Sequence, residues 1–269
     1  MTMTTHGMLA GRRVRRLGFG TMRLTGPGIW GPPVDEKNAM QVLRSAVQSG
    51  AQHIDTADAY GPHDAETLIR KSLYPYADDL IIATKGGFTR QGPGRWTPCG
   101  VPAYLRQCVE MSLRRLGVDA IDLYYLHRVD PAVPLADQVG ELDQLRTEGK
   151  IKALGLSKVN IAQIEEAATI APLAAIQNTF SMINTESADV VRWCEQNEVA
   201  FVPYAPLGAG RCLEHAGGAG EGRCTPHEAL RWLLDYSPAT FPIPGTANLL
   251  HLSENMNADD EIRGQSFIS

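Results

Sequence analysis

The sequence predicts an α/β protein, a (β/α)8 TIM barrel with an N-terminal β-hairpin, in a single domain over residues 1–269. Short apolar segments alternate with segments of helical periodicity, roughly one pair every 30 residues, which is typical of parallel strands joined by helical crossovers. The length of 269 residues also suits one barrel, since barrels commonly run to about 250 residues. No Pro-, Gly- or Ser-rich linker divides the chain.

The first elements can be placed from turn residues and periodicity. Residues 8–14 predict a tight hairpin that turns at Gly11, ahead of a first core strand at 17–20. A loop rich in Gly and Pro follows at 25–33. The first helix is expected from about residue 35 to 49, because apolar side chains recur there at three- and four-residue steps, and Gly50 ends it.

The same alternation continues to the end of the chain. Strands are predicted near residues 53–55, 80–84, 121–126, 151–156, 174–177, 200–204 and 241–243. Helices are predicted near residues 65–73, 102–116, 134–148, 161–169, 186–197, 225–236 and 248–256. The alternative, an open Rossmann sheet, is disfavoured because the GxGxxG pattern is missing: Gly208-Ala209-Gly210 begins it, but no final glycine follows at the required step.

The composition excludes several classes of function. The chain is 43% hydrophobic and 20% charged, with a net charge of -5 and a pI of about 5.8. Nucleic acid and membranes are therefore not expected partners. No apolar run approaches the roughly 20 residues needed to span a bilayer, and residues 1–7 carry no apolar signal core, so we expect a cytoplasmic protein. Five cysteines without CxxC spacing predict free thiols rather than disulfides or a metal site.

Four polar residues stand at or just beyond predicted strand ends. Asp55 ends the second strand and Tyr60 lies on the loop after it. Lys85 and His127 follow the apolar segments 80–84 and 121–126. In barrels of this kind the carboxyl ends of the strands and the loops after them carry the active site, so these side chains are expected to converge.

Together these four residue types can perform acid–base chemistry on a carbonyl. A phenol near its usual pKa of about 10 is a weak acid at neutral pH, and a neighbouring ammonium stabilises its phenolate. A carboxylate would hold that ammonium charged and oriented. A neutral imidazole can donate a hydrogen bond to a carbonyl oxygen, so the set would polarise and protonate a carbonyl while a further group attacks its carbon.

Each residue taken alone has a structural alternative. Asp55 could cap the next helix, Lys85 could be a charge at the rim, Tyr60 could be packing, and His127 could be a core histidine with satisfied hydrogen bonds. The functional interpretation depends on finding all four at three strand ends.

An ordered set of motifs connects these residues with a known family. The sequence resembles the aldo-keto reductase superfamily over nearly its whole length, through residues 18–23 (GFGTMR), 54–57 (IDTA) with Tyr60-Gly61, 83–85 (ATK), 123–127 (LYYLH), 155–157 (GLS), 204–208 (YAPLG) and 243–246 (IPGT) with Glu254-Asn255. Residues 23–33 are similar to those of bacterial pyridoxal reductase-like members.

The resemblance implies a hydride donor, NADPH, with NADH as a second option, held across the barrel mouth. It implies Tyr60 as the general acid, Asp55 and Lys85 as the residues that tune it, and His127 as the group that orients the carbonyl. Residues implied to line the cofactor are Gly20, Thr21, Met22, Asp55, Ser157, Gln177, Tyr204, Pro206, Leu207, Gly208, Gly245, Thr246, Asn248, Glu254 and Asn255. For Thr246 and Asn248, ordinary helix capping is the alternative.

Three positions depart from the family pattern. Lys158 stands where an asparagine usually follows the serine of the Gly-x-Ser motif, which puts one carboxamide contact in doubt. His251 stands where many relatives carry an arginine for the 2′-phosphate of NADPH. Residues 209–223 are shorter than the corresponding segment of many relatives, so the clamp over the cofactor is expected to be abbreviated or mobile.

Aromatic residues on the loops after the first and third strands are the candidates for the substrate pocket. Trp30, Phe88 and Trp96 predict a flat or ring-bearing substrate. The alternative is that they only pack these loops together.

The function expected from the sequence is NAD(P)H-dependent reduction of an aldehyde or ketone by a monomer or weak homo-oligomer. One alternative keeps the fold without turnover, as a cofactor-binding regulatory or sensor protein. Another is a barrel lyase with Lys85 as a Schiff-base former, which leaves Tyr60, His127 and the Gly245-Thr246 loop without a role.

Overall fold

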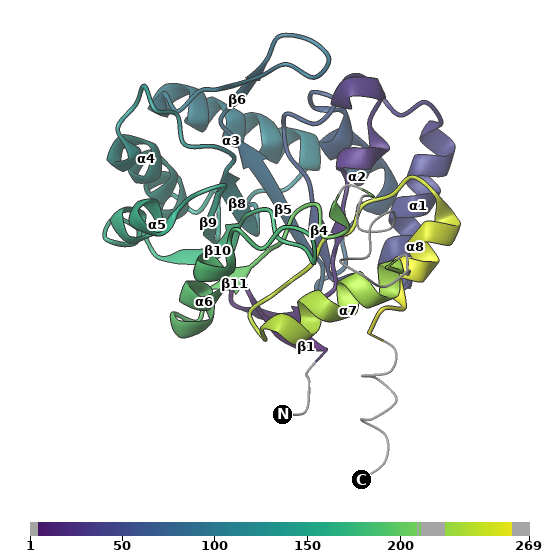
Figure 1. The fold of residues 1–269 in the computed structure, drawn as a ribbon. Helices are drawn as coiled ribbons and strands as arrows, with labels where there is room; N and C mark the ends of the chain where they lie inside the picture. The colour runs from purple at the N-terminus through teal and green to yellow at the C-terminus, as the bar shows by residue number, and fades with distance from the viewer. Residues whose placement is uncertain (1–4, 209, 211–223, 260–269) are drawn as a thin grey trace.

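The centre of the molecule is a sheet of seven parallel strands that curls into a TIM-barrel-like α/β fold (Figure 1). The computed structural model describes residues 5–208, 210 and 224–259. The order across the sheet is β11-β10-β9-β8-β5-β4-β3. The strands are β3 (Phe19–Gly20), β4 (His53–Asp55), β5 (Ile81–Gly86), β8 (Leu123–Leu126), β9 (Leu154–Ser157), β10 (Leu173–Gln177) and β11 (Ala200–Phe201).

Both edges of this sheet bond to one irregular segment, residues 239–244. Phe241 N donates to Phe201 O beyond β11 at 2.7 Å, while Gly18 N donates to Pro242 O at 2.9 Å on the β3 side. The prediction of a regular eighth strand at 241–243 is wrong, because no strand is assigned there. Pro242 and Pro244 have no N–H and cannot complete a ladder, so only part of the pairing forms.

Helices cover the outside of the sheet, as the periodicity predicted. They are α1 (Glu36–Gln48), α2 (Asp64–Leu73), α3 (Pro102–Leu116), α4 (Leu135–Thr147), α5 (Ile161–Ala168), α6 (Ala188–Gln196), α7 (Pro226–Tyr236) and α8 (Leu249–Met256). Asp35 caps the start of α1, where its side chain accepts from Asn38 N, and Gly117, at φ +73°, caps the end of α3. Such a left-handed residue is the usual stop of a helix. Among the described residues no helix is long and apolar enough to cross a bilayer.

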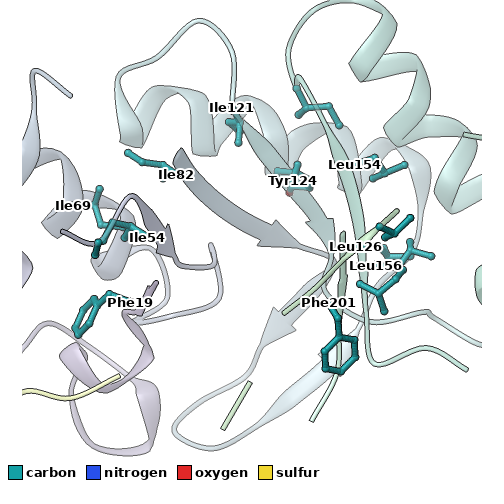
Figure 2. Packing of buried hydrophobic residues seen from close by; sticks show 14 of the residues in the cluster. Phe19, Ile54, Ile69, Ile82, Ile121, Tyr124, Leu126, Leu154, Leu156 and Phe201 are labelled. Atoms are coloured by element: carbon teal, nitrogen blue, oxygen red, sulfur yellow. The ribbon is translucent and has the colours of Figure 1, made fainter. Parts of the chain in front are cut away.

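Two apolar layers lie on either side of the strands. The outer layer packs the strands against the helices, and Figure 2 shows part of it, with Phe19, Ile54, Tyr124, Leu156 and Phe201 among its members. A smaller cluster fills the interior of the curled sheet, from Leu9, Val14, Ile81, Ala83, Leu123, Tyr125, Ala175, Ala200, Val202, Phe241 and Ile243. The sheet is therefore buried on both faces, as parallel sheets generally are.

The predicted N-terminal hairpin is present and lies across the amino ends of the strands. It consists of β1 (His6–Leu9) and β2 (Arg12–Arg15), with Gly11 at φ +76° in the turn. Arg15 forms a buried ion pair with Asp259 and donates to Ser49 O, at the end of α1, and to Met256 O, in the last turn of α8. The hairpin thus stabilises the end of the fold opposite to the predicted catalytic residues.

The loop after β5 contains structure that the sequence patterns did not predict. Residues 88–98 form a second hairpin from β6 (Phe88–Arg90) and β7 (Trp96–Pro98). Two short 3-10 helices, η1 (Met22–Leu24) and η2 (Pro27–Ile29), occupy the loop after β3. These pieces are too short to show a period of their own, which is why they escape detection from the sequence.

Candidate active site

Asp55 and Lys85 meet at the carboxyl ends of two neighbouring strands. Asp55 pairs with Ala83 in the parallel register of β4 and β5, so Lys85, two residues further on, faces the same side of the sheet. Lys85 Nζ donates to Asp55 Oδ1 at 2.5 Å and to Thr56 O at 2.8 Å. The second carboxylate oxygen accepts from Gln177 Nε2 at 2.7 Å. The pair is buried, with Lys85 0% and Asp55 3% exposed.

The electrostatics of this pair keep the lysine charged. Burial acts to lower the pKa of Lys85, but Asp55 and Tyr60 together outweigh it, and the net pKa is raised above its usual value. Tyr60 reaches the same point from the loop after β4, with Lys85 Nζ 5.3 Å from its ring centre. Burial raises the pKa of Tyr60, and the charge of Lys85 opposes that rise. The phenol is therefore protonated at neutral pH, next to the cation that stabilises its conjugate base.

His127 completes the group from the end of β8. Its backbone N–H donates to Gly86 O at 2.8 Å, and its ring lies 5.8 Å from that of Tyr60 and 4.7 Å from that of Phe88. Burial lowers the pKa of His127 well below its usual value, and the charges of Lys85, Arg128 and Arg90 lower it further. The imidazole is thus neutral at physiological pH, as the predicted role requires.

These contacts bear on the structural alternatives for the four residues. The Asp55 carboxylate bonds to Lys85 and Gln177, and the N-cap position of α2 is held by His63. Lys85 is fully buried, so it is not a rim charge. Nδ1 of His127 is buried without a hydrogen-bond partner in the described part of the chain, whereas buried polar atoms in protein cores are nearly always bonded. The structure brings all four residues together.

The predicted pocket aromatics differ in how near they lie to this group. Trp96 lies 6.4 Å from the Tyr60 ring and 6.3 Å from His127, and Phe88 packs on Trp96 at 5.4 Å between ring centres. Trp30 lies further out: it is 36% exposed, and its ring contact is with Arg90. Phe88 and Trp96 therefore wall the site, while Trp30 belongs to its rim.

Several residues predicted to line the cofactor lie around the catalytic group. Thr21 follows β3, where its N–H and hydroxyl both donate to Asp55 O, at 2.9 and 3.1 Å. Ser157 ends β9 and is buried, and Gln177 ends β10. In this structure the Gln177 amide is bonded to Asp55, an interaction that the sequence did not predict. Gly20 and Met22 flank Thr21.

A close approach between two loops explains one predicted glycine. A side chain at Gly245 would collide with the carbonyl oxygen of Gly20, so only glycine lets the segment before α8 pack against the end of β3. On the other side of the mouth, Tyr204 N donates to Asn178 O at 3.0 Å. Pro206, Leu207 and Gly208 continue the same loop. The predicted short clamp at 209–223 falls on residues 209 and 211–223, which lie outside the described residues.

The residues predicted for the adenosine end cluster at the start and along one side of α8. Asn248 caps this helix through its side chain, which accepts from Leu250 N and His251 N, and Thr246 Oγ1 accepts from Asn248 N at 3.0 Å. The capping alternative for both residues is thus realised. Glu254 is exposed, whereas Asn255 is buried and its Oδ1 has no partner in the described part of the chain. The unpaired, buried Oδ1 of Asn255 can accept a hydrogen bond from a nucleotide base.

The comparison with known families decides the affiliation of the chain. Residues 16–221 match the aldo/keto reductase family. The chain belongs to this family. Among its relatives are an uncharacterized oxidoreductase of Schizosaccharomyces pombe, 46% identical over 91% of this chain and 81% of the relative, and the pyridoxine 4-dehydrogenase of Escherichia coli, 38% identical over 93% of this chain and 91% of the relative.

Solved aldo-keto reductase structures share the fold. A glycerol dehydrogenase from Gluconobacter oxydans superposes with a TM-score of 0.84 at 24% identity, covering 97% of this chain and 93% of the other. An aldo-keto reductase from Klebsiella pneumoniae in complex with NADPH gives a TM-score of 0.78 at 23% identity, covering 98% and 94%. At identities of 23–24% these similarities show the fold alone. Among the described residues of this aldo-keto reductase, no group of three or more His, Cys, Asp or Glu side chains could hold a metal ion.

Arg90, on β6, is a residue that the sequence did not single out. Its guanidinium donates to the carbonyl oxygens of Gly28 and Ile29 after β3, of Ala59 in the loop that carries Tyr60, and of Arg95 in its own hairpin. The same group lies 3.5 Å from the centre of the Trp96 ring. Arg90 therefore fastens three loops around the site. The sequence carries no signal for this role, because the carbonyl oxygens belong to backbone of distant segments.

Arg128 was also missed, although its position next to His127 was available as a signal. Its Nη1 donates to His127 O at 3.1 Å and to Ser157 Oγ at 3.3 Å. Its guanidinium carbon lies 5.8 Å from the Phe88 ring centre and 5.9 Å from that of Tyr204. It thus joins the predicted substrate side of the site to the predicted cofactor side.

Proposed function

We propose that this aldo/keto reductase reduces an aldehyde or ketone to an alcohol, with Tyr60 as the general acid and NADPH as the reductant. The observation that carries the proposal is the buried Asp55–Lys85 pair beside the Tyr60 ring, with neutral His127 opposite. An NADPH-bound structure is known for a protein of this fold. The cofactor, when bound, supplies the hydride for the carbonyl carbon.

The chain's own residues supply the proton and orient the carbonyl. His127, neutral because its pKa lies well below the usual range, donates a hydrogen bond to the carbonyl oxygen. Tyr60 gives its proton to that oxygen as negative charge develops there. The resulting phenolate is stabilised by Lys85, which Asp55 holds in place at 2.5 Å. Gln177 and Thr56 fix the Asp55–Lys85 pair, so little reorganisation accompanies the transfer.

The surroundings of Lys85 argue against Schiff-base chemistry. A lysine that attacks a carbonyl must be deprotonated and is typically desolvated away from carboxylates. Here burial lowers the pKa of Lys85, but Asp55 and Tyr60 together raise it above its usual value. The lysine is better suited to tune Tyr60 than to act as a nucleophile.

A ring-bearing aldehyde is the substrate class that the pocket favours. Phe88 and Trp96 present their faces and edges next to His127 and Tyr60, and such walls suit a flat ring. One relative is named pyridoxine 4-dehydrogenase, and the reverse of the dehydrogenation of an alcohol is the reduction of the corresponding carbonyl compound. We propose pyridoxal, or an aldehyde of similar shape, as the substrate.

The test is NADPH oxidation with a panel of aldehydes that includes pyridoxal, in the wild type and in Tyr60→Phe. The variant is expected to lose about 10²- to 10⁴-fold in kcat, the usual contribution of general acid–base catalysis. NADPH affinity, measured by fluorescence titration, should stay nearly unchanged. Wild-type turnover in the variant would remove Tyr60 from the acid role. NADPH binding without oxidation of any aldehyde would favour a regulatory or sensor protein instead.

A further inference from the structure

Arg128 is a half-buried cation in the site for which the described residues provide no carboxylate. Its protein contacts are the two acceptors His127 O and Ser157 Oγ and the two rings of Phe88 and Tyr204. Both hydrogen bonds come from Nη1. Since a guanidinium carries five N–H donors and stays charged, those on Nε and Nη2 have no acceptor among the described residues.

Three other partly buried or buried arginines of this chain are paired with carboxylates, whereas Arg90 is bonded to four backbone carbonyl oxygens. Arg15 is bonded to Asp259, Arg106 to Glu141 and Glu148, and Arg115 to Glu66. Within the site itself, the charge of Lys85 is balanced by Asp55. Arg128 therefore leaves a local positive charge in a chain whose net charge is -5. A partly desolvated charge of this kind is stabilised by an anion that can accept from the free edge of the guanidinium.

The position of this charge points to the substrate rather than to bulk solvent. Arg128 directly follows His127, and its guanidinium lies beside Phe88, one of the two aromatic walls. An anionic group bound to its free donors would lie near a carbonyl held by His127. The two aromatic walls favour a ring between the anion and the carbonyl.

We propose that Arg128 binds an anionic oxygen substituent of the substrate, so that the preferred substrates are ring-bearing carbonyl compounds with a carboxylate, phosphate or aryl oxide group near the carbonyl. This inference rests on the proposed function. Arg128 is then a specificity-determining residue, and His127, Tyr60 and Lys85 perform the chemistry as before.

The experiment compares 2-, 3- and 4-carboxybenzaldehyde with the corresponding formylbenzamides, which have nearly the same shape without the charge. For the best carboxylate isomer, kcat/KM should exceed that of its amide in the wild type, and Arg128→Met should reduce it about 10- to 100-fold. For the corresponding amide, kcat/KM should change by less than about threefold in this variant. Arg128→Lys should recover part of the loss, because an ammonium keeps the charge without the planar fork.

Arg13→Met provides the matched control. Arg13 is an exposed arginine on β2, in the hairpin at the opposite end of the strands. Its removal changes the net charge by the same amount and should alter neither substrate series. An equal loss of kcat/KM for carboxylates and amides in Arg128→Met would overturn the proposal, because Arg128 would then act on the shape of the site and not on the anionic group. A drop in NADPH affinity with no change in carboxylate preference would assign Arg128 to the cofactor and also overturn it.

A binding measurement separates this inference from the proposed reaction. Benzoate should quench the fluorescence of the wild-type protein through Trp96 and compete with substrate, and it should bind at least tenfold more weakly to Arg128→Met. If benzoate binds in this way but no aldehyde is reduced, the proposed reaction fails while the anion site stands. If aldehydes are reduced but benzoate binds equally to both proteins, the anion site fails alone.

Discussion

Replacing Lys85 by methionine removes the ammonium from a buried pair and leaves the Asp55 carboxylate with one side-chain donor. That donor, Gln177 Nε2, lies 2.7 Å from Oδ2, whereas Oδ1 loses its contact with Lys85 at 2.5 Å. Removing one partner of a buried ion pair typically destabilises a protein by about 3–5 kcal/mol. Because Gln177 remains, we expect a loss near the lower end, about 3 kcal/mol.

The same change should slow reduction sharply. Lys85 is the charge that opposes the rise in the pKa of Tyr60 caused by burial, and the remaining carboxylate acts in the same direction as burial. In Lys85→Met the pKa of Tyr60 therefore rises further, and kcat should fall by about 10²- to 10⁴-fold. The fall in kcat should be smaller in Asp55→Asn. The Lys85 ammonium and its bond to Thr56 O persist there, although Asp55 no longer orients the ammonium.

The double variant Lys85→Met, Asp55→Asn gives the decisive measurement. With neither charge present, its unfolding free energy from urea titration and its kcat/KM should both lie well above the values expected from adding the single losses. A coupling energy of about 2 kcal/mol or more is expected for groups in direct contact. Strict additivity in both assays would mean that Asp55 does not serve Lys85, and the model of a tuned phenol would be refuted.

Two further predictions concern Asp58 and His251. Asp58, whose N–H donates to Lys85 O, is fully buried; burial and then Glu66 raise its pKa from 3.8 to about 7. The contribution of the protonated carboxyl to stability is therefore present below pH ~4 and lost as pH rises to 7. The free energy of unfolding of Asp58→Asn, measured by urea titration, should rise relative to that of the wild type by up to about 4 kcal/mol across this window. Parallel pH profiles of the two proteins would contradict this. His251, exposed in the first turn of α8, offers the 2′-phosphate of NADPH no guanidinium, so the preference for NADPH over NADH should be modest; a large ratio of the two kcat/KM values would argue for another determinant.

The sequence predicted best what depends on local periodicity. The helix predicted near residues 102–116 is α3, and apolar periodicity matches its buried face, which consists of Leu105, Cys108, Val109, Ser112, Leu113 and Leu116. The strand-end positions of Asp55, Lys85 and His127 followed from short apolar runs, since parallel strands bring their carboxyl ends to one edge. Where apolar residues alternate with prolines, as at 241–244, the pattern predicted a strand that the backbone cannot pair regularly.

Contacts between loops could not be predicted in this way. The hairpin at 88–98 carries Phe88, Arg90 and Trp96 into the site, yet nothing in its sequence shows which backbone carbonyls Arg90 reaches. At Lys158 the sequence showed a departure from the family pattern but not the backbone conformation of the residue. The structure places it in the left-handed region at φ +55°, a conformation that asparagine adopts more readily than lysine, which gives a backbone reason for the asparagine that the family resemblance implies at this position.

The hydrogen bonds of Arg90 to three loops have a consequence for redesign of the substrate site. One guanidinium is hydrogen-bonded to the backbone after β3, after β4 and within the β6–β7 hairpin, so the conformations of the three loops depend on one another. A loop grafted alone from another reductase would have to offer a carbonyl oxygen at the same place, or it would release the other two loops and the segment that carries Tyr60. Transplanting substrate preference into this barrel therefore requires the three loops to be exchanged together.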